Sequence, residues 1–414
     1  MAKIKAFMGV RPAADKVKAV ASPPYDVLNS AEARIMAKEN PYSFLHIGKP
    51  EIDLPPEINQ YDEAVYQKGR ENLYKFIQNR VLIQDDKPCY YLYRLIMGKV
   101  DEIGLVAAAS IEDYENDIIK KHEHTRADKE ADRTKHADIL NANSGPVFLT
   151  YRARQDMNDL VTELVKNDPL YDFVADDGIR HIVWKIDQEK IITQITAIFR
   201  KIDFLYVADG HHRSAAGTKV GQNRRAANPH HTGEEEYNYF LSVIFPHDQL
   251  YIMDYNRIVQ DLNGLSNEEF LAKVEENFVV EKFCCADSFK PEELHTFGMY
   301  FSGNWYKLTA KSGTFPVNDP VKSLDVSILQ ENLLHPILGI GDPRKDERID
   351  FVGGIRGLKE LSKRVDAGEA VAFAMFPTSI EQLMAIADAG KIMPPKSTWF
   401  EPKLRSGVIV HLLD

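Results

Sequence analysis

The sequence predicts an α+β (mixed α/β) fold, and two features indicate it. Short apolar runs rich in β-branched and aromatic residues alternate with segments of helical spacing along all 414 residues. The plainest of these runs is Phe204–Ala208, which passes through Asp209-Gly210 into the small residues Ser214–Gly217. We interpret it as a buried strand that enters a tightly packed helix through a glycine turn.

The first part of the chain carries most of the predicted strands. Extended pattern is present at Lys3–Val10, Val17–Val20, Ser43–Ile47, Cys89–Ile96, Ile103–Ile111, Gly145–Arg152, Gly178–Ile186, Asn238–Phe245 and Leu250–Ile258. Helical spacing is present at Ala31–Glu39, Asn59–Asn79, from Ala127 onward, and at Gln155–Lys166 and Glu189–Phe199.

After residue 262 the pattern of predicted elements changes, because helices alternate with shorter strands. The predicted helices are Glu268–Asn277, Val326–Leu334, Gly357–Val365 and Ile380–Ala389. The predicted strands are Phe297–Phe301, Trp305–Leu308, Ala370–Phe376 and Val408–Leu412. We therefore expect two domains: residues 1–262, and a C-terminal α/β domain over residues 263–414 that contributes a basic loop.

The composition is that of an ordinary globular protein and excludes some partners. Hydrophobic residues make up 44% and charged residues 27% of the chain, and the net charge is −11. A general nucleic-acid or membrane-surface binder needs a basic face, so we expect neither partner. A local basic pocket remains compatible with this balance.

Cysteine usage and the N-terminal sequence bear on the compartment. Cys284 and Cys285 are adjacent and Cys89 is distant, which gives neither a disulfide framework nor a CxxC metal site. The N-terminus has no long apolar core, and no window reaches the length of a membrane span. These features favour a cytoplasmic protein without a signal peptide.

The turn at Asp209–Arg213 is the strongest candidate site. A strand that feeds a helix through a glycine leaves backbone N–H groups free at the helix start, where the helix dipole is positive. Such a place binds phosphate. His211, His212 and Arg213 would add two imidazoles and a guanidinium in the first helical turn. The alternative is a plain connection whose histidines face water.

Three other segments carry candidate residues, each with a structural alternative. Ser22–Asp26 is a proline-stiffened loop that presents Tyr25 and Asp26. His122–Arg126 precedes a charged segment that also fits a solvated, salt-bridged helix. Met393–Gly407 is a loop with three cations, which also fits simple solvent exposure. Its cations are Lys396, Lys403 and Arg405.

Taken together, these motifs resemble a widespread bacterial family known as domain of unknown function 1015. The resemblance covers nearly the whole chain. It rests on SPPYD at Ser22–Asp26, NPYSFLH at Asn40–His46, KHEHTRADKEADR ending at Arg133, DGHHR at Asp209–Arg213 and MPPKSTWFEPKLRSG ending at Gly407.

The Asp-Gly-His-His-Arg turn also resembles, more distantly, the nucleotide-binding element of the ParB/sulfiredoxin superfamily, which includes free-serine kinases. This resemblance implies a ParB/sulfiredoxin-like nucleotide-binding core with elaborations, in which Gly210, His211, His212 and Arg213 contact phosphates. Sulfiredoxin chemistry needs a cysteine in this motif, and the chain has none there. ParB-type partition needs a basic arm, which is also missing.

The function we expect is a nucleotide-dependent small-molecule phosphotransferase, acting on serine or a related hydroxyl metabolite by analogy with the serine-kinase branch. Phosphoryl transfer needs positioned phosphates, cations around the migrating group and a carboxylate for the acceptor hydroxyl. The turn would hold ATP or ADP with Mg²⁺. The remaining roles are assigned as follows: Arg126 with Lys396, Lys403 or Arg405 neutralises charge, and Glu123 or Asp26 is the base.

Two other functions stay open. One is a metal-dependent phosphohydrolase that binds Zn²⁺ or Mn²⁺ through His122, His124, His211, His212 and an aspartate, and activates water. Adjacent histidines on a helix project about 100° apart, so His211 and His212 would hardly share one ion. The other is a nucleotide-binding regulatory protein without turnover. The oligomeric state is left open, with a homodimer among the alternatives.

Overall fold

The computed structural model describes residues 1–283 and 288–414. Cys284 and Cys285 therefore lie outside the described residues. The chain divides into two compact units, Met1–Leu250 with Pro402–Asp414, and Tyr251–Glu401. The expected division at residue 262 differs from this, because Tyr251–Val259 pairs with later strands and the last thirteen residues rejoin the first unit.

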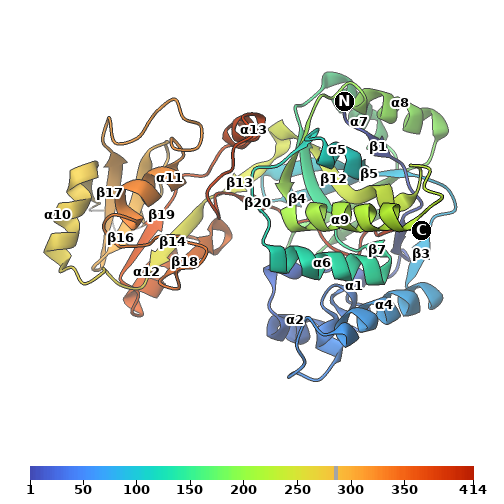
Figure 1. Ribbon diagram of the computed structural model, residues 1–414, viewed down its shortest axis with the longest axis horizontal. Coiled ribbons are helices and arrows are strands. Elements are labelled where there is room, and N and C mark those ends of the chain that lie inside the picture. The colour runs from blue at the N-terminus through green and yellow to red at the C-terminus, as the bar shows by residue number, and fades with distance from the viewer. Residues whose placement is uncertain (284–287) are drawn as a thin grey trace. The chain divides into compact units, whose positions relative to one another are not determined.

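The first unit is built on a large mixed sheet (Figure 1). Its strands run in the order β6 (Ile119–Lys120), β11 (Leu205–Asp209), β8 (Val147–Tyr151), β12 (Tyr239–Pro246), β5 (Val100–Ser110), β4 (Tyr90–Met97), β10 (Arg180–Ile186) and β9 (Tyr171–Val174), with β1 (Ile4–Lys5) beside β5. β6 is parallel to β11, and β8 is parallel to β12, whereas β11 is antiparallel to β8.

Helices cover this sheet and complete its core. They are α4 (Glu63–Gln78), α5 (Ile111–Glu115), α6 (Ala127–Leu140), α7 (Gln155–Leu164), α8 (Glu189–Phe199) and α9 (His211–Ala227). Met157 of α7 and Phe199 of α8 are buried against the sheet. α6 and α9 lie side by side (Figure 1), and α9 approaches β12 so closely that a Cβ at Gly217 would lie 2.9 Å from Phe240.

Two predicted strands are wrong, because both segments are helical. Val17–Val20 forms α1, and α3 spans Leu45–Gly48 where an extended Ser43–Ile47 was predicted. Residues three apart are buried together in each case, Val17 with Val20 and Phe44 with Ile47, which is helical spacing. The helix predicted at Ala31–Glu39 is α2 (Ser30–Ala37), which the Asn29 side chain caps.

The second unit has its own sheet and core. Its strands run in the order β15 (Phe278–Phe283), β17 (Asn304–Ala310), β16 (Thr296–Phe301), β19 (Val371–Ala374), β14 (Tyr255–Val259) and β18 (Ile349–Gly353). The helices are α10 (Asn267–Asn277), α11 (Asp325–Leu329), α12 (Leu358–Asp366) and α13 (Ile380–Asp388). Ile258, Trp305 and Leu361 are among its buried core residues. The mixed α/β class predicted from the sequence is thus confirmed.

No helix within residues 1–283 and 288–414 is long and apolar enough to cross a membrane.

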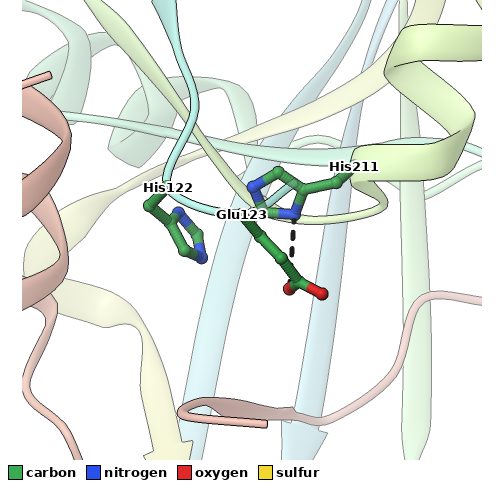
Figure 2. A group of neighbouring side chains, drawn as sticks. All are labelled: His122, Glu123 and His211. Carbon is green, nitrogen blue, oxygen red and sulfur yellow. Dashed lines mark ion pairs between the residues drawn. The ribbon is translucent and has the colours of Figure 1, made fainter. Parts of the chain in front are cut away.

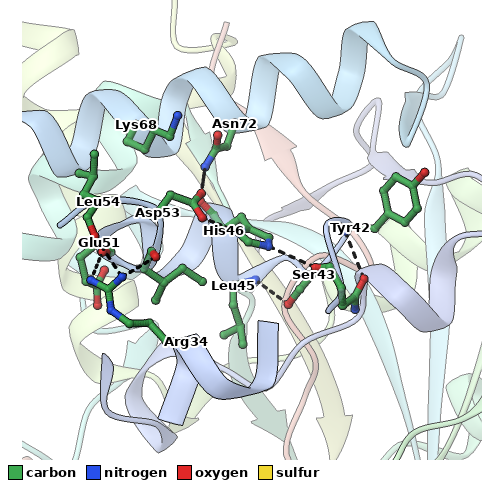
Figure 3. Close-up of polar contacts among 12 residues, drawn as sticks. Arg34, Tyr42, Ser43, Leu45, His46, Glu51, Asp53, Leu54, Lys68 and Asn72 are labelled. Carbon is green, nitrogen blue, oxygen red and sulfur yellow. Dashed lines mark hydrogen bonds and ion pairs between the residues drawn. The ribbon is translucent and has the colours of Figure 1, made fainter. Parts of the chain in front are cut away.

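An ion pair between His46 of α3 and Asp53, together with a hydrogen bond from Asn72 of α4, holds these segments of the first unit together (Figure 3). His46 Nδ1 lies 2.7 Å from Asp53 Oδ1, and Asp53 Oδ2 accepts a hydrogen bond of 2.7 Å from Asn72 on α4. The bond to Asp53 raises the pKa of His46 above 6.5. Burial would raise the pKa of Asp53, but the bonds from His46 and Asn72 outweigh it and hold that pKa below 3.8.

The first prediction concerns the pH dependence of this pair. His46 stabilises the fold below its unfolded pKa of 6.5 and ceases to do so as pH rises through its raised folded pKa. Asp53 stabilises it above 3.8 and ceases to do so as pH falls through its depressed pKa. His46→Gln should therefore lower the thermal midpoint most near about pH 5 and least near about pH 8. His230→Gln, in an exposed loop, is the control, and a pH-independent loss in His46→Gln would contradict the prediction.

Candidate functional site

Parallel pairing brings two candidate segments to the same sheet edge. Leu205 of β11 is opposite Ile119 of β6, and Tyr206 is opposite Lys120. The carboxyl ends of parallel strands meet at one edge, which is where open α/β sheets bind ligands. Residues 121–126 and 209–213 therefore leave the sheet next to each other, although more than 80 residues separate them in sequence.

Gly210 forms the tight turn between β11 and α9. It is the N-cap residue of α9 and has φ +93°, a left-handed conformation that strains residues with a side chain. The first helical bond is donated by Ser214 N–H to the Gly210 carbonyl. The N–H groups of residues 211–213 thus have no carbonyl partner within the helix, and the positive end of the dipole lies at this turn.

Arg213 folds back across the turn and is held on three sides. Its guanidinium Cζ would lie 3.2 Å from a Cβ at Gly210, and one nitrogen donates to the Pro146 carbonyl. Another lies 3.5 Å from Asp26 Oδ2 and 4.0 Å from Asp209 Oδ2. Burial would lower the pKa of Arg213, but Asp26 and Asp209 outweigh it and keep the group charged. A fixed positive charge therefore lies beneath the turn.

Lys403 brings a second cation to the same carboxylate. Its Nζ lies 3.0 Å from Asp209 Oδ2, although the two residues are 194 positions apart. Burial would raise the pKa of Asp209, but Lys403 and Arg213 outweigh it and hold the pKa below its usual range. Asp209 is thus ionised at neutral pH and orients both cations.

Two buried imidazoles lie beside this cluster (Figure 2). The rings of His122 and His211 meet edge to face with centroids 4.4 Å apart, and Glu123 Oε2 lies 4.0 Å from His211 Nδ1. Burial lowers the pKa of His211 to about 4 and that of His122 well below its ordinary value. Both rings are therefore neutral at pH 7. One ligand atom from each of the three residues lies within 4.8 Å of the others, a spacing that fits a metal ion.

His212 has a different environment from His211. Its Nε2 accepts a hydrogen bond of 3.1 Å from the backbone N–H of Arg126, so this nitrogen carries no proton. Burial lowers the pKa of His212. The Arg126 guanidinium is exposed and pairs with Asp128 at 2.9 Å. His212 thus joins the loop before α6 to the start of α9.

The structure brings most of the predicted site residues together, in the first unit. They are Asp26, Glu123, Arg126, Asp209, Gly210, His211, His212, Arg213 and Lys403. His124 is exposed and is not one of the three residues whose ligand atoms lie within 4.8 Å of one another. Arg405 is buried, and its partner is Asp177. Lys396 belongs to the second unit, where its Nζ lies 5.6 Å from the Tyr255 ring centre and its carbonyl accepts from Arg257.

Comparison with known proteins identifies the family. The profile described as "Protein of unknown function (DUF1015)" matches residues 4–327, which is more than half of the chain. The chain belongs to this family. None of the curated proteins compared with it matches.

Several solved structures are similar to this DUF1015 chain. One is "Free serine kinase in complex with AMP", at 12% identity and TM-score 0.35, covering 73% of this chain and 91% of that one. Another is "SbnI with C-terminal truncation from Staphylococcus aureus", at 11% identity and TM-score 0.40, covering 74% and 87%. A conserved hypothetical protein from Pyrococcus furiosus has 14% identity and TM-score 0.36, covering 75% and 95%. With TM-scores below 0.5, the ParB/sulfiredoxin-like core stays a prediction.

Two contributions to the site of this family member were not predicted from the sequence. The Pro146 carbonyl accepts a hydrogen bond from Arg213 because β8 begins at Val147, antiparallel to β11. Tyr25 was predicted only as a residue presented by the Ser22–Asp26 loop, and the Arg133 guanidinium lies 4.2 Å from its ring centre. No sequence signal points to Pro146, since the contact depends on the strand register. The Arg133 contact also depends on tertiary structure, because Tyr25 and Arg133 are distant in sequence.

A small cavity lies under the turn, with a volume of about 50 Å³. Tyr25, Arg133, Gly145 and Arg213 are among its lining residues. This volume admits water molecules but not a nucleotide. Asp26, Glu123 and Arg126 lie beside the same turn, with 39%, 45% and 63% of their side chains exposed.

The second prediction tests the geometry of the turn with two glycines of equal φ. Gly210 and Gly233 both have φ +93°, but a Cβ meets Arg213 at Gly210 and nothing within 4 Å at Gly233. The left-handed conformation costs each alanine variant about 1–2 kcal/mol. Gly210→Ala must also displace the guanidinium, so we expect a lower thermal midpoint for Gly210→Ala than for Gly233→Ala. Equal midpoints would show that the Arg213 guanidinium is not fixed against Gly210.

Proposed function

We propose that this protein is a nucleotide-dependent phosphotransferase that phosphorylates a hydroxyl group of a small metabolite. The observation that carries the proposal is the start of α9. There, free N–H groups follow the left-handed Gly210, with Arg213 and Lys403 fixed beside them. Backbone N–H groups, a helix dipole and two cations together form a site for phosphate oxygens.

Each cation has a distinct place in this proposal. Arg213 is buried and held by Pro146, Asp26 and Asp209, so it acts as a preorganised charge that need not move during the reaction. The present partners of Lys403 and Arg126 are carboxylates, and the two side chains are 19% and 63% exposed. The phosphate oxygens of a bound nucleotide would compete with these carboxylates for Lys403 and Arg126. Arg405 and Lys396 have other surroundings, as described above.

The chemical step is written as follows. The oxygen of the acceptor hydroxyl attacks the terminal phosphorus of the nucleotide, and a new O–P bond forms as the bond to the leaving phosphate oxygen breaks. The hydroxyl proton passes to a carboxylate. Asp26 and Glu123 are the two candidates, because both lie beside the turn with 39% and 45% of their side chains exposed.

The proposed phosphate donor and its metal ion are inferred from the Asp209–Arg213 turn and the carboxylates beside it. ATP and ADP both present a terminal phosphate to such a turn, and the proposal includes both. Mg²⁺ prefers oxygen ligands, and the carboxylates of Asp26 and Glu123 fit this preference. When bound with the nucleotide, Mg²⁺ would supply further neutralisation of phosphate charge. Serine or a related hydroxyl metabolite is the acceptor we propose, on the resemblance of the Asp209–Arg213 motif.

The third prediction concerns nucleotide binding. Arg213→Ala should weaken ATP or ADP binding by about 10–100-fold, the cost of losing hydrogen bonds to a charged group. Isothermal titration calorimetry measures this. Arg180→Ala is the matched control, since Arg180 is exposed and paired with Asp172 in the same unit. Unchanged affinity in Arg213→Ala, with the variant shown to be folded by circular dichroism, would refute the phosphate site.

The fourth prediction separates transfer from binding. We expect phosphoryl transfer from ATP or ADP to one member of a panel of hydroxyl metabolites that includes serine. Either Asp26→Asn or Glu123→Gln should lower the rate by about 10²–10⁴-fold while nucleotide affinity stays within a few-fold. Tight nucleotide binding without transfer to any acceptor would favour the regulatory protein over the enzyme.

A further inference from the structure

His122, Glu123 and His211 form a compact group that the proposed phosphoryl transfer does not fully explain. The first two follow β6 and the third begins α9, so the parallel pairing of β6 with β11 places them together. One ligand atom from each lies within 4.8 Å of the others. Figure 2 shows the side chains of His122 and Glu123, from the loop after β6, next to that of His211 at the start of α9.

Two buried nitrogens of this group lack hydrogen-bond partners among the described residues. Among residues 1–283 and 288–414, neither Nδ1 of His122 nor Nε2 of His211 has a hydrogen-bond partner. The two residues are only 2% and 5% exposed. A buried polar atom left unsatisfied costs about 1–3 kcal/mol, so its retention calls for an explanation. A bound metal ion that accepts the lone pairs of these two nitrogens would explain why they are retained.

We propose that His122, Glu123 and His211 bind a transition-metal dication of the Zn²⁺ class. Two imidazole nitrogens with one carboxylate oxygen form a donor set that suits Zn²⁺ and related ions. Mg²⁺ takes oxygen ligands, so the two imidazoles favour an ion of the Zn²⁺ class at Glu123 over the Mg²⁺ assigned to this carboxylate above. Three protein ligands leave a fourth position open, as in catalytic zinc sites.

The surroundings support this assignment. The Val207 backbone carbonyl hydrogen-bonds the His122 ring, and such outer contacts orient metal-ligating histidines. His212 is excluded as a ligand through Nε2, because that atom accepts the Arg126 N–H. Glu123 is 45% exposed, so its side chain can approach the two rings, and the open position would face the partly exposed side of the turn.

This site goes beyond the proposed phosphotransferase and refines it. A metal ion held by Glu123 would lie beside the N–H groups at the start of α9. Its open position would then accept a phosphate oxygen or a water molecule. Glu123 would be engaged as a ligand, which leaves Asp26 as the carboxylate for the acceptor hydroxyl.

Metal binding is tested on full-length protein that has been freed of metal with a chelator and carries no affinity tag. Zn²⁺ is titrated by calorimetry, and Co²⁺ is added to record the visible absorption of a tetrahedral site. We expect one equivalent per chain. Glu123→Gln should weaken Zn²⁺ binding by at least about tenfold, the lower end of the loss seen for outer contacts of metal sites. His122→Ala and His211→Ala should abolish the Co²⁺ absorption.

His124→Ala is the matched control, because His124 is exposed in the same loop and should leave Zn²⁺ affinity unchanged. Since His122 and His211 are buried, circular dichroism checks their variants, and the exposed Glu123→Gln keeps the test valid if they misfold. Failure of the wild type to bind Zn²⁺ or Co²⁺ stoichiometrically would overturn the proposal, as would equal affinity in Glu123→Gln and His124→Ala. Nucleotide titration of the same chelator-treated protein with Mg²⁺ assesses the phosphotransferase separately.

Discussion

The site depends on one short pairing, that of β6 with β11. Only two residue pairs join these strands, Ile119 with Leu205 and Lys120 with Tyr206. Because the strands are parallel, both chains leave the sheet in the same direction, and the loop before α6 meets the start of α9. An antiparallel pair would carry the two loops to opposite edges. The contacts between His122 and His211, and between Arg126 and His212, follow from this direction.

The second constraint is the burial of positive charge under the turn. A buried guanidinium loses its hydration and is tolerated only where carbonyls and carboxylates replace the water. Arg213 donates to the carbonyl of Pro146, the residue before β8, and pairs with the carboxylates of Asp26 and Asp209. Asp209 is shared with Lys403, so the cations are held at fixed separation by one anion. The fold itself therefore holds both cations in place beside the turn.

Secondary-structure elements with a strong local pattern were predicted correctly from the sequence. Elements whose burial depends on tertiary contacts were predicted wrongly. The strand at residues 205–209 and the glycine turn were predicted because an apolar run and Asp-Gly are local signals. Val17–Val20 was wrongly predicted as extended, since four residues show too little periodicity to separate a strand from a helical turn. A segment of four residues is therefore too short for its pattern of apolar residues to separate a strand from a helix.

The same distinction explains the site. The Asp209–Arg213 turn and the residues that follow β6 could be predicted as candidates, because each is a dense local motif. Their mutual position could not, because it depends on which strands pair. Lys403 and Arg405 appeared equivalent in one basic loop, but they have different partners, Asp209 and Asp177. Lys396 of that loop belongs to the other unit.

The roles of the two carboxylates at the turn can be argued from their neighbours. Glu123 lies next to two neutral imidazoles, an environment that favours a shared cation over a free base. Asp26 lies next to a buried guanidinium, which attracts its carboxylate and keeps it oriented. A base for a hydroxyl proton must be held in place before the acceptor arrives. On these grounds Asp26 is the stronger candidate for the base, and Glu123 the stronger candidate for a ligand.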